Sequence, residues 1–113
     1  MRYARLFCGL ILFAAVIKPS AVHNLTPISG AGATVPITTS SCAVRADWIQ
    51  VLAPSGNSAV VWFGDSTTSG SSGLPIAAGG GYNTPVVPGS PYNLCNHYVY
   101  VANGDTAYVA YGN

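Results

Sequence analysis

The sequence predicts an all-β protein, a single small β-sandwich or jelly roll of about seven short antiparallel strands. Short apolar or alternating segments recur along the chain, and turn clusters of Gly, Pro, Asn and Ser separate them every 8 to 12 residues. No window after residue 33 shows the 3.6-residue period of an amphipathic helix. The length of 113 residues leaves room for one domain.

The first 21 residues read as a hydrophobic leader. Arg2 and Arg5 precede an apolar run over residues 6–17, and Lys18 and Pro19 close it. A basic start followed by such a run is typical of a secretory signal, and the run is short for a membrane-spanning helix. A retained hydrophobic arm and an unused upstream start codon are the alternatives. Residues 22–33 contain few large apolar groups and predict a flexible linker, so we expect the β-sandwich domain over residues 34–113.

Three strands are expected in the first half of the domain. Residues 35–39 form the first, and Pro36 places it at a sheet edge. Residues 43–53 alternate in polarity and predict the longest strand. After a turn at residues 54–57, the apolar run 59–63 predicts a buried strand.

Four more strands are expected after a loop rich in Ser and Thr at residues 64–73. They cover residues 74–77, 82–87, 96–102 and 106–111. Asn103-Gly104 separates the last two, and Asn-Gly between two β-type runs is a strong hairpin signal.

Charge is scarce in the expected domain. After Lys18 the chain carries one basic residue, Arg45, and three acidic ones, Asp47, Asp65 and Asp105. One arginine does not neutralise several phosphates, so nucleic-acid binding is not expected, and a membrane contact is expected only through a retained leader. A small surface with so little charge tends to associate, which indicates assembly or adhesion and a homo-oligomer.

Cys42 and Cys95 form an even pair once Cys8 leaves with the leader. Export favours a disulfide between them, which closes a loop of about fifty residues and contributes roughly 4 kcal/mol. The alternative is that both are small buried thiols. Neither cysteine has a neighbouring Cys or His at a metal-binding spacing, so no zinc site is expected.

Gly64-Asp65-Ser66 after an apolar run resembles the first block of the GDSL-type lipases and esterases, in which the serine is the nucleophile. Thr67 stands where that family has leucine, and the one downstream histidine, His97, has no acid three residues before it. Asp65 and Asp105 lack the spacing of a calcium loop. We therefore expect no enzyme, no metal and no cofactor, with Asp65 in a turn and His97 as a hydrogen-bonded strand residue.

Six of the seven tyrosines follow residue 81. In residues 98–101, Tyr98 and Tyr100 share one strand face and Val99 and Val101 the other, and the valine face is the better core candidate. Tyrosine combines a large contact area with a hydroxyl. The candidates for interface anchors or glycan-stacking platforms are Tyr98, Tyr100, Tyr108 and Tyr111. The alternative is that the tyrosines line the rim of the domain's own core.

A series of strand and turn motifs runs through the chain from Val35 onward. These motifs are Val35-Pro36-Ile37, Cys42, Trp48-Ile49-Gln50-Val51, Ala53-Pro54, Asn57, residues 61–63 with Gly64-Asp65-Ser66, Gly73-Leu74-Pro75-Ile76, Gly79-Gly80-Gly81, Tyr92-Asn93-Leu94, Tyr98-Val99-Tyr100-Val101 and Gly104-Asp105. Their order resembles that in small β-sandwich proteins encoded among bacteriophage structural genes. The resemblance implies a virion component of the capsid decoration, cement, head-spike or tail-associated type, which packs against other virion proteins such as the major capsid protein.

The sequence thus predicts a non-enzymatic virion structural protein that acts through subunit contacts and is located in the virion. The alternative is an exported β-sandwich module, secreted or at a cell surface, that recognises a surface glycan or an adhesin partner.

Overall fold

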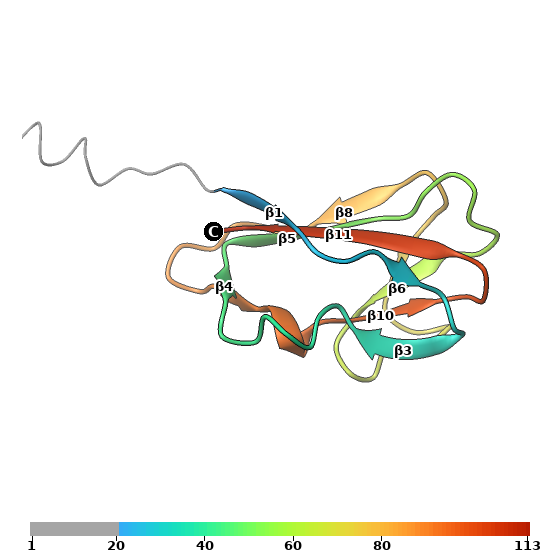
Figure 1. The fold of residues 1–113 in the computed structure, drawn as a ribbon, viewed down its shortest axis with the longest axis horizontal. Coiled ribbons are helices and arrows are strands. Elements are labelled where there is room, and N and C mark those ends of the chain that lie inside the picture. The colour runs from blue at the N-terminus through green and yellow to red at the C-terminus, as the bar shows by residue number, and fades with distance from the viewer. Residues whose placement is uncertain (1–20) are drawn as a thin grey trace, which may run out of the picture.

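Two antiparallel β-sheets face one another in the computed structural model, which describes residues 21–113 (Figure 1). The all-β prediction is confirmed, and the described part of the chain contains eleven strands, more than the seven expected. The difference comes from short strands of two or three residues that the sequence pattern does not separate from loops. No helix within residues 21–113 has the length and apolarity needed to span a bilayer.

The first sheet has the order β1-β11-β5-β8, and β2 lies along the same edge of β11 as β1. Its strands are β1 (Val22–Asn24), β2 (Ile28–Ser29), β5 (Trp48–Leu52), β8 (Gly81–Asn83) and β11 (Thr106–Gly112). β11 is the longest strand and pairs over five residues with β5. It therefore forms the centre of this layer.

The second sheet has the order β3-β10-β6-β7. Its strands are β3 (Ala33–Pro36), β6 (Val61–Gly64), β7 (Leu74–Ile76) and β10 (Tyr98–Val101). β3 lies at the edge, as Pro36 predicts, because proline has no N–H to donate to a further strand. β4 (Arg45–Ala46) and β9 (Tyr92–Asn93) pair with each other and form a small ribbon beside one end of the sandwich. A single 3-10 turn, η1 (Leu94–Asn96), follows β9.

The core lies between the two sheets and is almost entirely aliphatic. Alternate residues of each strand point inward, so Val99 and Val101 of β10 are buried, as the alternation predicts. The largest fully buried side chains are Ile49, Leu94, Val51, Val61, Val99 and Val101. Burial of these groups from both sheets is the main force that holds the layers together.

Residues 22–33, expected as a linker, belong to the sandwich. Both β1 and β2 pair with β11, and Leu25 N–H donates to the Val109 carbonyl oxygen at 2.9 Å. Most of this stretch is exposed because it forms an edge of the sheet, while Leu25 and Ile28 pack against the core. The expected leader, apart from Ala21, lies outside the described residues.

The expected strand 43–53 is divided into β4 and β5 at Asp47. Ala46 and Ile49 are both buried although they are three positions apart, so the two-residue alternation shifts its phase at this point. The expected strand 82–87 is also shorter than predicted, since β8 ends at Asn83 and Val86 and Val87 are exposed.

The prediction of a hairpin at Asn103-Gly104 is wrong. β10 and β11 belong to different sheets, and the turn between them carries the chain from the second sheet to the first. Gly104 has a φ of +82°, whereas Asn103 has a negative φ. The hairpin turn of the Asn-Gly type requires positive φ at both residues, and a turn in which only the second of the two has positive φ splays the strands apart.

Candidate functional site

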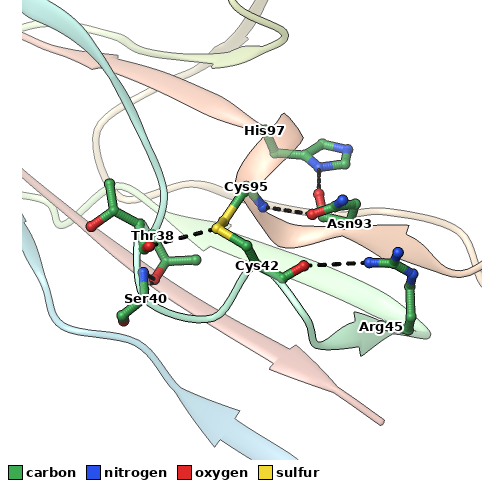
Figure 2. Close-up of a disulfide and its surroundings, with 8 residues drawn as sticks. Thr38, Ser40, Cys42, Arg45, Asn93, Cys95 and His97 are labelled. Carbon is green, nitrogen blue, oxygen red and sulfur yellow. Dashed lines mark hydrogen bonds between the residues drawn. A yellow bond between two sulfur atoms is a disulfide. The ribbon is translucent and has the colours of Figure 1, made fainter.

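The disulfide between Cys42 and Cys95 is present and ties the segment before β4 to η1 (Figure 2). The two Cα atoms lie 5.0 Å apart and 53 positions separate the residues. Asn93 Oδ1 accepts a hydrogen bond from Cys95 N–H at 3.1 Å and thereby caps the 3-10 turn. The disulfide fixes the end of the sandwich where the β4–β9 ribbon lies.

His97 is a packing residue next to this disulfide. Its Nδ1 lies 2.8 Å from the Asn93 carbonyl oxygen (Figure 2). Its ring stacks on Phe63 with centroids 5.8 Å apart and meets Tyr92 edge-on at 5.7 Å. The hydrogen bond agrees with the prediction, but His97 lies between η1 and β10 rather than within a strand.

Asp65 organises the turn that follows β6. Its Oδ1 accepts hydrogen bonds from the backbone N–H and the hydroxyl of Thr67. These two bonds favour the ionised carboxylate and lower its pKa, the hydroxyl bond being the larger cause. Asp65 therefore has the turn role that the sequence predicts.

Asp105 is buried and accepts hydrogen bonds from another turn. Its carboxylate binds Ser58 N–H at 2.8 Å, Ser58 Oγ at 3.0 Å and Ala59 N–H at 2.9 Å. The bond from Ser58 N–H contributes most to lowering the pKa of this carboxyl, while burial opposes the shift. Within residues 21–113 no three His, Cys, Asp or Glu side chains gather as a metal site would require.

The four candidate tyrosines do not form one surface. Tyr98 and Tyr100 lie on the outer face of the second sheet, and Tyr108 lies on the outer face of the first. Tyr111 points into the core, is only 9% exposed and stacks on His23 with ring centroids 5.0 Å apart. The prediction of Tyr111 as an interface or glycan-stacking candidate is therefore wrong, because Tyr111 is a core residue.

The outer face of the second sheet carries three half-buried aromatic rings, those of Tyr98, Tyr100 and Trp62. Tyr100 pairs in register with Trp62 on one side and Thr34 on the other. The 64–73 loop folds back over part of this face, since Thr34 Oγ1 donates to the Thr68 carbonyl oxygen and Gly70 lies against the Tyr100 ring. The outward residues of this sheet are Thr34, Pro36, Trp62, Gly64, Pro75, Tyr98 and Tyr100, none of which is charged.

The outer face of the first sheet is also uncharged but has a different chemistry. Tyr108 is 47% exposed and Leu52, its partner on β5, is 41% exposed. Trp48 and Gln50 of β5 alternate with buried residues and so share this face. The outward residues are Val22, Asn24, Ser29, Trp48, Gln50, Leu52, Gly81, Asn83, Thr106, Tyr108, Ala110 and Gly112.

Sequence reasoning found Tyr108 on this face but not Trp48, Gln50 or the asparagines beside them. The alternation in residues 48–52 separates Trp48 and Gln50 from Ile49 and Val51 and is the signal that identifies them. Asn24 and Asn83 carry no comparable signal because their strands are three residues long.

A groove of about 380 Å³ opens along one flank of the sandwich. Residues 24–28 of the first sheet's edge and residues 36–40 beside the second sheet line it. Thr26, Thr38, Thr39 and Ser40 make its wall largely hydroxylic. The described residues thus present two uncharged sheet faces and one polar groove for contact with other molecules.

The chain matches no family model, no curated protein and no solved structure at a significant level.

Proposed function

We propose that this protein is a non-enzymatic structural component of a virus particle, of the decoration or cement type, which acts by packing against other virion subunits. The observation that carries the proposal is the outer face of the second sheet. Tyr98, Tyr100 and Trp62 lie there side by side between Pro36 and Pro75, with no charged side chain among them.

Such a face suits contact with another polypeptide. Burying a charge costs several kcal/mol unless it is paired, and this face has no charge to bury. Tyrosine and tryptophan are enriched at the energetic centres of protein interfaces, where their rings fill pockets of the partner. A capsid protein with complementary apolar hollows is the partner we propose.

The disulfide fits a position on the outside of a particle. Disulfides persist in oxidising surroundings, which include virion surfaces. A domain of this size buries a modest fraction of its surface and gains stability from a covalent link or a partner subunit. The Cys42–Cys95 bond supplies the first of these.

The test is binding of the purified full chain to particles that lack it, followed by co-sedimentation. Pro75→Glu places a charge on an exposed position of the second-sheet face and is expected to weaken binding at least tenfold. Val86→Glu is the matched control, because Val86 is 61% exposed in a loop outside both sheets, and binding should be unchanged. Failure of the unaltered chain to bind particles, or equal binding by both variants, contradicts the proposal.

A further inference from the structure

Apart from Ser29 and Thr106, the outward residues of the first sheet form three rows across the strands. Asn24, Ala110, Gln50 and Asn83 occupy the middle row, since each is the register partner of the next. We call Asn24, Gln50 and Asn83 the amide row. One side row holds Trp48 and Gly112, and the other holds Tyr108 and Leu52.

The centre of this face is hollow. Ala110 stands between Asn24 and Gln50 and has a side chain of one methyl group, so the surface dips there. The depression measures about 80 Å³. It is lined by Asn24, Gln50, Leu52, Tyr108, Val109 and Ala110.

The polar groups around the hollow have no hydrogen-bond partner among residues 21–113. No described residue donates a hydrogen bond to, or accepts one from, the side chains of the amide row, the Tyr108 hydroxyl or Trp48 Nε1. Asn57 and Asn113 differ, because their amide groups are hydrogen-bonded within the domain. An amide without a protein partner keeps both its donor and its acceptor capacity.

Two aromatic rings flank the amide row. A Cβ atom on Gly112 would overlap the indole of Trp48, so the ring lies directly over the Gly112 backbone. On the other side Tyr108 is the most exposed aromatic residue of the face. Strands lie about 4.8 Å apart, so the amide row spans roughly 14 Å from β1 to β8, with a ring on each side.

We propose that this face binds a neutral oligosaccharide, laid across the strands along the amide row. Amide groups donate to and accept from sugar hydroxyls, and the Trp48 and Tyr108 rings offer apolar surfaces with a polar tip to the C–H faces of the sugar. No outward residue of the sheet is charged, so nothing on this face pairs with an acidic glycan. The site is on the sheet face opposite the proposed capsid contact and is independent of it.

Affinity electrophoresis of the purified full chain tests this site without any virus particle. The gels contain a neutral polysaccharide (xylan, galactomannan or a soluble β-glucan) or, for comparison, acidic polygalacturonate. We expect at least one neutral polymer to retard the chain and polygalacturonate to leave its mobility unchanged. Retardation by none of the neutral polymers, or by polygalacturonate alone, overturns the proposal.

Variants then place the binding on the amide row. Gln50→Ala and Tyr108→Ala are each expected to weaken binding tenfold or more. Asn96→Ala is the matched control, because Asn96 is an exposed amide in η1, outside the first sheet, and it should bind as the unaltered chain does. Equal loss in Asn96→Ala, or full binding by Gln50→Ala and Tyr108→Ala, overturns the assignment.

A second copy of the chain is the competing occupant of an uncharged sheet face. Light scattering of the same samples distinguishes the two. If the chain is dimeric and Tyr108→Glu makes it monomeric, the face is a contact between copies and the glycan site is overturned. A mass independent of Tyr108→Glu, together with retardation by a neutral polymer, supports the glycan site.

Discussion

The carboxylate of Asp105 accepts a hydrogen bond from the backbone N–H of Ser58 at 2.8 Å, although the two residues are 47 positions apart in sequence. This hydrogen bond joins the turn after β10 to the turn between β5 and β6. Asn57 adds a second link, since its amide donates to the Thr106 carbonyl oxygen at 2.8 Å and accepts from Thr106 N–H at 3.0 Å. The crossing from one sheet to the other is therefore held by side chains rather than by a strand ladder.

Replacing Asp105 by asparagine should destabilise the domain. The amide cannot accept all three hydrogen bonds as the carboxylate does, and bonds to a charged acceptor are stronger than neutral ones. We expect a clearly lower thermal midpoint by circular dichroism. Asp65→Asn is the control, because Asp65 bonds only within its own exposed turn, and its midpoint should change much less. Equal midpoints for the two variants contradict this role of Asp105.

The same carboxylates predict acid sensitivity. Folding lowers the pKa of Asp105 and of Asp65 below the ordinary value of 3.8. A depressed folded-state pKa contributes stability that is complete above the unfolded-state value and is lost as pH falls through the folded-state value. Urea unfolding from pH 6 to pH 2 should show stability falling below about pH 4. The fall should be shallower in Asp105→Asn, and an identical pH profile in that variant contradicts the prediction.

Removing the disulfide should lower stability by about 4 kcal/mol, because the Cys42–Cys95 bond closes a loop of more than fifty residues. The change is Cys42→Ser with Cys95→Ser, and urea unfolding under oxidising conditions measures it. Adding a reductant should bring the unaltered chain to the stability of the variant. The reductant should leave the stability of the variant unchanged. A further loss of stability in the variant would contradict the assignment of the effect to this disulfide.

Gly112 is expected to tolerate no side chain while Trp48 covers it. Gly112→Ala forces the methyl group into the indole and should cost about 1–3 kcal/mol, the usual range for overpacking. Trp48→Ala should remove most of this penalty in the double variant, which a double-mutant cycle measures. Gly56→Ala is the control, since nothing lies within 4 Å of a Cβ there. Additive effects of Gly112→Ala and Trp48→Ala contradict the contact.

Local alternation predicted much of the fold. It separated Val99 and Val101 from Tyr98 and Tyr100, and proline chemistry placed β3 at an edge. The pairing of distant strands was not available from local patterns. Asn103-Gly104 has the composition of a hairpin, yet the side-chain links at Asp105 and Asn57 hold the chain in a crossing between sheets.

The candidate site was predictable only in part. Tyr108 stood out as an aromatic residue in a β-type run, but the amide row exists because the registers of β1, β11, β5 and β8 bring Asn24, Gln50 and Asn83 into line. A shift of one residue in any pairing would turn one of these side chains to the opposite face. Tyr111 was misplaced although local alternation indicates its direction, since Tyr108 and Tyr111 lie three positions apart in β11 and so face opposite sides.

The two tryptophans of the chain, Trp48 and Trp62, lie on opposite outer faces and report on each face separately. Hydroxyl-radical footprinting of the chain free and bound to virus particles measures the oxidation of each ring by mass spectrometry. A contact through the second sheet predicts that Trp62 is protected on the particle and that Trp48 reacts as in the free chain. Protection of Trp48 with Trp62 unchanged would contradict the account.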